Sequence, residues 1–213
     1  MTRPLRQSEL ERWRHIPTAI VADVSSGACL IDPEIRPLLP IGQQPRLFGR
    51  AVTAQCEEAD LGAVLRALDM VDSGDVLVIA ANGHRHHAMI GEILGGQLRR
   101  KGGVGLICDG AIRDVAELGN WKGFSVFTRH ITPRGPTGFA AGNTNVAVAF
   151  GGLTIAPGDL IIGDADGLCA LTPALARNLL GDAEAKLSLE AQWQQKLASG
   201  ASVANTFGLT KIK

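Results

Sequence analysis

Residues 91–117 read GEILGGQLRRKGGVGLICDGAIRDVAE, and this stretch decides the fold. Its first part, residues 91–100, has the apolar spacing of an amphipathic helix. The run 104–108 is short, apolar and rich in β-branched residues, which predicts a buried strand. We expect Asp109 and Gly110 to form a turn at the carboxyl end of that strand, before a second helix. Alternation of helix and strand is typical of an α/β domain.

Charged side chains stand at the start of both expected helices. Glu92 falls in the first turn of the first helix, and Arg113, Asp114 and Glu117 are expected in the first turn of the second. Ligands of open α/β sheets bind beyond the carboxyl ends of strands, where helix amino termini offer free N–H groups. The N–H groups of residues 91–94 could therefore hold a carboxylate. Arg113 could grip a second pair of oxygen atoms, and Asp114 could bind a hard divalent cation.

The same residues also have an ordinary structural interpretation. Asp114 could simply complement a helix dipole, Glu117 could be a solvated acid of the first turn, and Arg113 could pair with either. Spacing alone does not decide between the two interpretations, because short motifs often match by chance.

The spacing forms a longer signature. Gly91-Glu92 is followed after twenty residues by Arg113-Asp114, and after two more by Glu117. This pattern resembles the class II pyruvate aldolases, which comprise the 4-hydroxy-4-methyl-2-oxoglutarate and 4-carboxy-4-hydroxy-2-oxoadipate aldolases and are similar in fold to the RraA regulators of ribonuclease E. The resemblance covers roughly residues 15–172. It includes the segments TAIVAD at 18–23, GRAVTA at 49–54 and PRG at 133–135.

The resemblance implies a role for each residue of the signature. The implied substrate-binding residues are Gly91, Glu92, Ile93, Leu94 and Arg113. Asp114 is the implied ligand of a divalent metal cation, Mg²⁺ or Mn²⁺. The implied catalytic residues are Arg113, Glu92 and Glu117, with the two acids organising metal-bound water.

The resemblance also implies a reaction. We expect a metal-dependent aldolase, a lyase that cleaves a 4-hydroxy-2-oxo acid to pyruvate and a second oxo acid. The same chemistry permits decarboxylation of oxaloacetate. The alternative is a non-catalytic RraA-like regulator that acts by protein contact, because a shared fold does not fix function. Glu117 favours the aldolase branch. The older family label of menaquinone methyltransferase has little support, since no glycine-rich nucleotide loop follows an early strand.

The resemblance sharpens the fold to an RraA-like β/β/α swivelling-type α/β domain, with a mixed central sheet and a carboxy-terminal helix. We treat residues 1–213 as a single domain with a core at about 15–172 and a helical extension at about 173–213. A homotrimer or homohexamer is implied, with sites at subunit clefts. Glu184 or Glu190 could complete the site of a neighbouring subunit.

Composition narrows the class of protein further. The formal net charge is zero and the pI is about 7.0, so there is no electrostatic sign of nucleic-acid or membrane binding. The four cysteines form no C-x-x-C pair, which predicts reduced thiols. No apolar run is long enough to span a membrane and no signal peptide is visible, so we expect a cytoplasmic location.

The rest of the chain alternates in the same way. We expect a helix at 7–15 capped by Ser8, a second helix opened by Pro17-Thr18, and a proline-rich edge region at 30–46. Further predicted elements are strands at 47–56, 75–81, 124–129, 146–155 and 160–163, helices at 61–71 and from Thr172 to about Leu197, and a hairpin turn at 164–167.

Two polar features remain. Residues 82–87, NGHRHH, contain three histidines, but they are spaced too closely for a zinc site and lack a fourth ligand. We expect His84, His86 and His87 to form a polar rim of the site instead. Asp23 is expected to have a surface or capping role.

Overall fold

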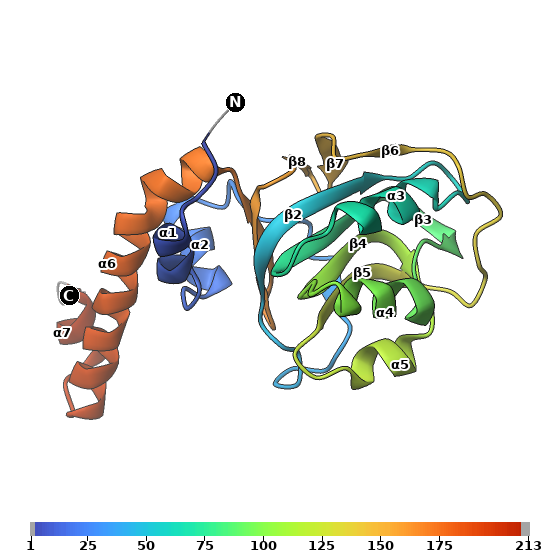
Figure 1. Cartoon of the computed structure of the whole chain (residues 1–213). Helices are drawn as coiled ribbons and strands as arrows, with labels where there is room; N and C mark the ends of the chain where they lie inside the picture. Colours follow the sequence, from blue (N-terminus) through green and yellow to red (C-terminus); the bar gives the residue numbers. More distant parts are fainter. Residues whose placement is uncertain (1–2, 210–213) are drawn as a thin grey trace.

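The computed structural model describes residues 3–209 as a mixed sheet packed against helices, with a helical arm at one side (Figure 1). Four parallel strands form the centre of the sheet: β2 (Leu47–Gln55), β3 (Asp75–Ala88), β4 (Gly105–Ile112) and β5 (Ser125–Ile131). Antiparallel strands extend it at both edges. They are β1 (Arg36–Pro37), β6 (Asn143–Thr144), β9 (Leu160–Asp164) and β10 (Gly167–Leu171).

The strand order β1-β5-β4-β3-β2-β9-β10 gives a nearly closed sheet of mixed direction, so the predicted fold class is confirmed. A separate hairpin is formed by β7 (Val148–Phe150) and β8 (Leu153–Ile155). Helices α3 (Gly62–Met70), α4 (Glu92–Arg100) and α5 (Val115–Asn120) cover one face of the sheet.

The apolar side chains are divided between the two faces of the sheet. One core lies between the sheet and α3, α4 and α5, and includes Leu68, Met89 and Leu98. A second core lies on the other face and is built around Phe127 and Phe150. The central strands are therefore buried on both sides, which explains their near-continuous apolar sequence.

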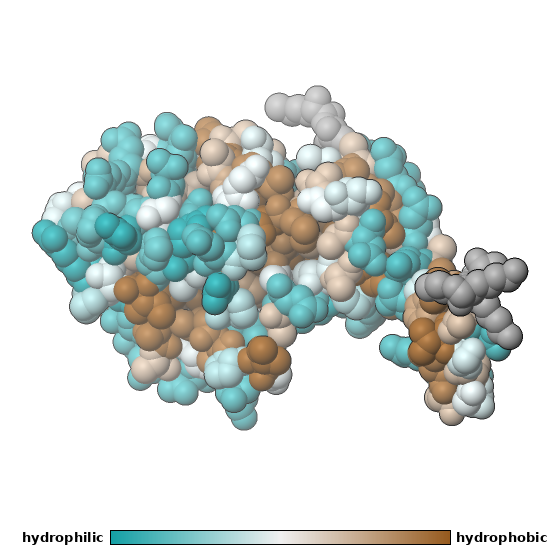
Figure 2. Space-filling view, turned by 180° about the vertical axis from the view of Figure 1, so that it is seen from behind, coloured by the Kyte–Doolittle hydropathy of each residue, from teal (hydrophilic) through white to brown (hydrophobic). Residues whose placement is uncertain are grey.

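The helical arm contains both ends of the described chain. Helices α1 (Gln7–Trp13) and α2 (Thr18–Val24) pack with the first half of α6 (Pro173–Ala198) around Trp13, which is fully buried. The second half of α6 extends away from the body and carries α7 (Val203–Phe207), whose Phe207 ring lies 4.7 Å from that of Trp193. Figure 2 shows apolar surface at this far end of the arm.

The two carboxy-terminal acids are engaged within the chain. Glu184 forms an ion pair with Arg12, and Glu190 lies 3.7 Å from Lys186. Lys186 also pairs with Asp23 at 3.0 Å, so Asp23 has the expected surface role. Among residues 3–209, none of the helices is long and apolar enough to cross a membrane.

Most predicted elements are confirmed within one or two residues, but several boundaries were wrong. Helix α1 begins after Arg6, whose backbone N–H binds Glu9, so Ser8 is not the cap. The predicted strand 146–155 is two strands, because Gly151 and Gly152 both have positive φ and turn the chain back.

Two further predicted boundaries were wrong, at the ends of strands β4 and β3. Strand β4 continues through Asp109-Gly110 to Ile112, and α5 begins only at Val115, so Arg113 and Asp114 precede this helix. Strand β3, predicted to end at residue 81, continues to Ala88.

Candidate functional site

Gly91 joins strand β3 to helix α4 at the centre of the site. Its backbone is extended, so conformation does not require glycine here. Packing does, because a Cβ atom at this position would lie 2.3 Å from Asp114 Oδ2 and 2.8 Å from Arg113 Cγ. The absence of a side chain at Gly91 therefore lets the two loops that follow β3 and β4 meet.

The amino terminus of α4 faces this meeting point. The backbone N–H of Glu92 donates a hydrogen bond of 3.1 Å to Asp114 Oδ2. The N–H groups of Ile93 and Leu94 have no acceptor among residues 3–209. Free N–H groups at the positive end of a helix dipole form a binding place for an anion. The sequence-based prediction for residues 91–94 therefore has the geometry it needs.

Asp114 is held in an unusual backbone conformation, with φ 55° and ψ 38° in the left-handed region. Asp is one of the few residues that tolerate this conformation. Although it stands at the N-cap position of α5, its side chain makes no capping hydrogen bond to that helix. The left-handed conformation directs the Asp114 carboxylate towards the start of α4 instead. Asp114 therefore does complement a helix dipole, but the helix is α4 and not α5.

Arg113 makes contacts on two sides. Its backbone N–H donates to the carbonyl of Ile90 at 3.0 Å, and its Nε lies 3.4 Å from Asp114 Oδ2. On the other side it packs against Gly135, where a Cβ atom would lie 2.6 Å from Arg113 Nη1. The side chains of Arg113 and Asp114 are both 39% exposed, so each can reach a ligand from solvent.

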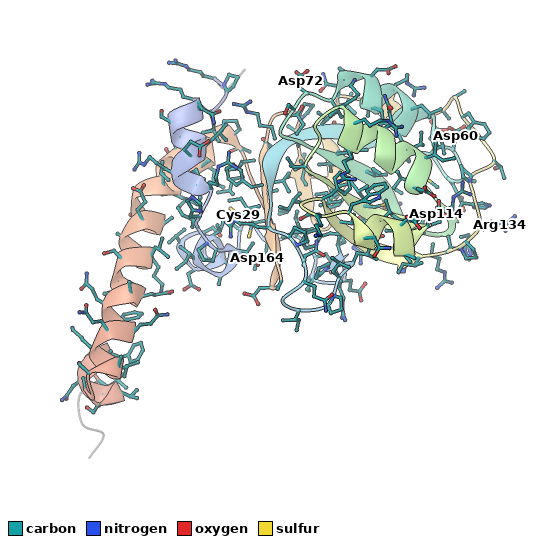
Figure 3. All side chains as sticks on the ribbon, turned by 60° about the horizontal axis from the view of Figure 1, so that its bottom comes forward. Cys29, Asp60, Asp72, Asp114, Arg134 and Asp164 are labelled. Carbon is teal, nitrogen blue, oxygen red and sulfur yellow. The ribbon has the colours of Figure 1, made fainter. Side chains whose placement is uncertain are left out.

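These groups surround one shallow hollow. Its lining residues are Leu61, Ala88, Ile90, Gly91, Ile93, Leu94, Arg113, Asp114 and Pro136. Figure 3 places Asp114, Asp60 and Arg134 at the same end of the sheet, away from Cys29 and Asp164 beside the helical arm. The lining is mostly apolar and includes one cation, Arg113, and one anion, Asp114, which suits a small anionic substrate.

The two expected catalytic acids, Glu92 and Glu117, lie close in sequence to lining residues of the hollow but are not among them, and they close no metal cage. The side chains of Glu92 and Glu117 are exposed, and the N–H of Glu117 binds the Asp114 carbonyl at 3.1 Å. Within residues 3–209, no three His, Cys, Asp or Glu side chains converge into a group that could hold a metal. Asp114 therefore offers a single carboxylate to a cation at this place.

Comparisons with known proteins show the family of the chain. A family model described as RraA-like, Aldolase/RraA, matches residues 18–169. The chain belongs to this family. Its RraA-like relatives include a protein of Halalkalibacterium halodurans (strain ATCC BAA-125 / DSM 18197 / FERM 7344 / JCM 9153 / C-125), whose name marks it provisionally as a 4-hydroxy-4-methyl-2-oxoglutarate aldolase. The two are 34% identical over 185 residues, covering 85% of this chain and 86% of the relative.

Two solved structures extend the likeness over almost the whole chain. One is an uncharacterized protein from Pseudomonas syringae pv. tomato str. DC3000, with a TM-score of 0.82 and 26% identity, covering 96% of this chain and 99% of that one. The other, from Streptomyces coelicolor, is RraAS2, described as an unusual member of the RNase ES inhibitor RraA protein family. It has a TM-score of 0.75 and 26% identity, covering 91% of this chain and 100% of the other.

The histidine segment of this RraA-like chain lies next to the hollow but inside strand β3, which corrects the predicted end of that strand at Ala81. Residues between Ala80 and Ala88 bulge out, because His84 pairs with Gly110 and Ala88 already pairs with Ala111. Positive φ angles at Asn82 and Gly83 make this excursion. The turn signal at these two residues was real, but it marks a bulge inside one strand.

The bulge brings two imidazole rings together. His84 Nε2 lies 3.1 Å from His87 Nδ1 and accepts the backbone N–H of His87 at 3.1 Å. Glu58 lies 3.4 Å from the other ring nitrogen of His84. Burial is the main cause that lowers the pKa of His87, followed by the charge of Arg134 and the neighbouring histidines. The rings form a packed pair beside the rim.

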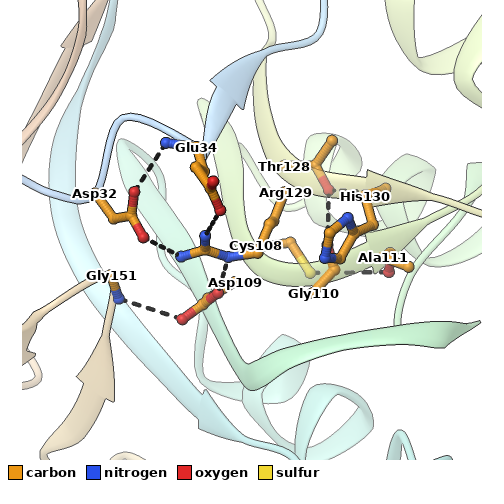
Figure 4. A network of polar contacts seen from close by, with 10 residues as sticks. All are labelled: Asp32, Glu34, Cys108, Asp109, Gly110, Ala111, Thr128, Arg129, His130 and Gly151. Carbon is orange, nitrogen blue, oxygen red and sulfur yellow. Dashed lines mark hydrogen bonds and ion pairs between the residues drawn. The ribbon is translucent and has the colours of Figure 1, made fainter.

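Asp109 has a structural role that the sequence did not reveal. It is buried, and its Oδ1 accepts a hydrogen bond of 2.6 Å from Arg129 Nε. The other guanidinium nitrogens of Arg129 reach Asp32 and Glu34 at 2.7 Å each (Figure 4). Burial would lower the pKa of Arg129, but Asp109 and Asp32 raise it, so the guanidinium stays charged. This network ties β4 and β5 to the loop after α2.

Proposed function

We propose that this chain is a divalent-metal-dependent pyruvate aldolase, which cleaves a 4-hydroxy-2-oxo acid such as 4-hydroxy-4-methyl-2-oxoglutarate to pyruvate and a second oxo acid. One observation carries the proposal: the free N–H groups of α4, the guanidinium of Arg113 and the carboxylate of Asp114 face one hollow. The name of the Halalkalibacterium relative supports the same reaction class. By the same chemistry, oxaloacetate is a second substrate, which would be decarboxylated.

Substrate binding follows from the charges. A carboxylate of the 2-oxo acid accepts hydrogen bonds from the N–H groups of Ile93 and Leu94. Arg113 can place a planar pair of donors on the keto oxygen, where negative charge develops as the carbon–carbon bond breaks. Donors already fixed in place stabilise that charge without reorganising during the reaction.

Asp114 is the proposed metal ligand. Its Oδ2 is engaged by Glu92, so Oδ1 is the oxygen that can bind a cation. Mg²⁺ accepts one or two protein carboxylates and keeps several waters, so a site with a single carboxylate fits this ion or Mn²⁺ better than zinc. When bound, such an ion supplies Lewis-acid stabilisation of the keto oxygen.

Glu92 and Glu117 are the proposed proton acceptors for the 4-hydroxyl group. Both carboxylates are exposed, and each residue is within three positions of a lining residue of the hollow. Each can accept a proton directly or through a water molecule, and a general base of this kind contributes about 10²–10⁴-fold in rate. Replacing each by Gln separately identifies the acid that acts as the base.

The deciding test measures pyruvate release from a panel of 4-hydroxy-2-oxo acids and oxaloacetate. We expect turnover that is abolished by a chelator and restored by Mg²⁺ or Mn²⁺. Full turnover in excess chelator, with metal absent by elemental analysis, contradicts the metal-dependent mechanism. Absence of pyruvate from every substrate contradicts the aldolase proposal itself.

A second candidate function is favoured by the likeness to the Streptomyces coelicolor RraA protein. A regulator of this kind would bind a ribonuclease by protein contact and would need neither Arg113 nor a metal. An assay of ribonuclease E inhibition, run with wild-type protein and Arg113→Lys, separates the functions. Equal inhibition by both proteins without pyruvate release supports the regulator.

We also propose that the protein assembles as a homotrimer or homohexamer with the hollow at a subunit boundary. Large apolar side chains are exposed around it, namely Ile93 (74%), Ile131 (57%) and Phe139 (63%). Such exposure at the rim of a polar site is typical of a covered surface. Light scattering coupled to size exclusion would show a monomer if this proposal is wrong.

A further inference from the structure

The segment of residues 132–142, here called the strap, connects β5 to β6 and crosses the end of the sheet that carries the hollow. Its first half contacts the site. The carbonyl of Arg134 accepts the N–H of Ala88 at 2.8 Å, and Gly135 packs on the Arg113 guanidinium. Pro136 lines the hollow itself. The strap therefore forms the wall behind Arg113.

The middle of the strap is anchored to the loop before α3. The carbonyl of Ala59 accepts the N–H groups of Thr137 and Gly138 at 2.8 and 3.0 Å, and Leu61 donates to Gly138 at 3.0 Å. Ala59 has a φ of 60°, which costs a non-glycine residue about 1–2 kcal/mol. Backbone strain of this kind persists only where surrounding contacts enforce it. The hydrogen bonds between the strap and this loop therefore hold Ala59 in its strained conformation.

Asp60 joins this anchor to helix α3. One carboxylate oxygen accepts the N–H of Gly62 at 2.7 Å, and the other accepts the N–H of Ala140 in the strap at 3.3 Å. These backbone bonds, with that to Gly62 the largest, lower the pKa of Asp60. Gly138 has no room for a side chain, because a Cβ atom there would lie 2.1 Å from Asp60 Oδ2.

Arg66 holds the last part of the strap. Its guanidinium donates to three successive carbonyls, those of Ala140, Ala141 and Gly142, at 2.8, 3.2 and 2.7 Å. The planar fork of arginine can reach three acceptors at once, whereas an ammonium group on a flexible stem cannot hold them in one plane. Asp60, just before α3, and Arg66, in the middle of α3, thus both secure the strap.

We propose that Asp60 and Arg66 are positioning residues for Arg113, acting through the strap. The inference rests on the proposed function. Arg113 makes a single ion contact within residues 3–209, the one at 3.4 Å to its neighbour Asp114, and its side chain is 39% exposed. Such a contact does not fix the direction of a long side chain. The backbone of Gly135 bounds the guanidinium on its other side, and Gly135 is held between the Ala88–Arg134 hydrogen bond before it and the anchored part of the strap after it.

The test compares Arg66→Ala and Asp60→Asn with two matched controls. Arg100→Ala removes an exposed arginine whose side chain, in the described part of the chain, bonds only to Gln97. Asp69→Ala removes an exposed acid on the same helix as Arg66. Steady-state pyruvate release, the affinity for oxalate with Mg²⁺, the affinity for Mn²⁺ alone, and thermal melting are measured for each protein. Oxalate mimics the planar oxygen pair that Arg113 would bind.

We expect both strap variants to lose about 10–100-fold in kcat, because a displacement of about 1 Å at a reacting group can cost about 100-fold. Oxalate affinity should fall in parallel, while Mn²⁺ affinity stays near wild type, since Asp114 is untouched. Arg66→Lys should recover little activity. Guanidinium chloride at millimolar concentration should restore part of the turnover of Arg66→Ala, an effect that a general loss of stability would not produce.

The outcomes separate this inference from the proposed function. A wild-type protein that neither releases pyruvate nor binds oxalate overturns both. A functional wild type with Arg66→Ala and Asp60→Asn equal to their controls overturns the positioning role alone. Equal losses of oxalate and Mn²⁺ affinity, without rescue by guanidinium, show general damage to the site and also overturn it. If Arg66→Ala fails to fold, Asp60→Asn gives the same comparison.

Discussion

Asp114 Oδ2 accepts the backbone N–H of Glu92 at 3.1 Å, across 22 residues of sequence. This bond joins the start of α4 to the residue that precedes α5. It leaves Oδ1 without a partner in the part of the chain that the structure describes. The two interpretations of Asp114 are therefore compatible, because one oxygen stabilises a helix terminus while the other can serve a ligand.

Replacing Asp114 by Asn tests the second role while preserving the first. Asn tolerates the left-handed backbone and keeps an acceptor for the Glu92 N–H, so the loss of stability should be about 1 kcal/mol or less. The lost charge should abolish Mn²⁺ binding and reduce kcat by at least about 100-fold, at the upper end of effects for partners of a metal site. Calorimetric titration with Mn²⁺ and melting curves provide the two measurements.

Asp23→Asn is the control for Asp114→Asn, since within residues 3–209 the Asp23 carboxylate pairs only with Lys186, on the surface. Retained Mn²⁺ binding by Asp114→Asn, with a melting temperature that falls, would show that Asp114 is a helix cap and nothing more.

Gly91→Ala tests the close approach of the two loops. The added Cβ would lie 2.3 Å from Asp114 Oδ2 and 2.8 Å from Arg113 Cγ, so both side chains must move. Overpacking of this kind costs about 1–3 kcal/mol, and activity should fall by more than stability explains. Turnover and urea denaturation on the same preparation make the comparison.

Gly181→Ala is the matched control, because its new Cβ would meet nothing within 4 Å in the exposed part of α6. It should stabilise the protein by about 0.5–1 kcal/mol and leave turnover unchanged. Normal activity of Gly91→Ala would mean that the loops adjust freely and that the observed contact is not needed.

The histidine pair predicts a dependence of stability on pH. Burial first, then the charges of Arg134, His84 and His86, lower the pKa of His87, while Glu58 opposes them. A base whose pKa is lower in the folded state binds protons better when unfolded, so stability is lost as pH falls below about 6.5. The free energy of unfolding should therefore drop more in wild type than in His87→Gln between pH 7.5 and about 5.5.

His15→Gln is the control for His87→Gln, because His15 is exposed on the helical arm. It should follow the wild-type pH profile. If His87→Gln follows that profile as well, the paired rings carry no proton-linked stability.

Elements with a strong local signal could be predicted from the sequence, and those set by distant contacts could not. The helical spacing of apolar residues in α4 and the apolar run of β4 are patterns within a few consecutive residues, and both elements were predicted from them. Asp109-Gly110 has the local chemistry of a turn, yet its pairing with β3 and the Arg129 ion pair keep it in the strand. Tertiary contacts decide such positions.

The candidate site divides in the same way. The structure places Gly91, Arg113 and Asp114 of the signature around one hollow, because each follows the carboxyl end of a parallel strand, and their roles in binding and catalysis stay a prediction. Asp60 and Arg66 were missed, since their role depends on a loop more than 70 residues later in the chain. Asp164 was assigned only to a turn, but its carboxylate also caps α2 through Thr18. The roles of these residues depend on contacts between distant parts of the chain, which no local sequence pattern indicates.

Arg113→Lys separates an enzyme from a binding scaffold. If Arg113 only pairs with Asp114, a pair whose partners are each 39% exposed, the change should be mild, since exposed ion pairs contribute roughly 0–1 kcal/mol and lysine keeps the charge. If Arg113 binds the keto oxygen in the transition state, lysine cannot reproduce its planar fork. The expected loss is then about 100-fold or more in kcat, comparable to removing an oxyanion donor at about 2.7–4 kcal/mol. Inhibition by oxalate should weaken in parallel, while Mn²⁺ binding at Asp114 persists. Near-normal turnover and oxalate inhibition in the lysine variant would remove Arg113 from the catalytic residues and favour the regulator.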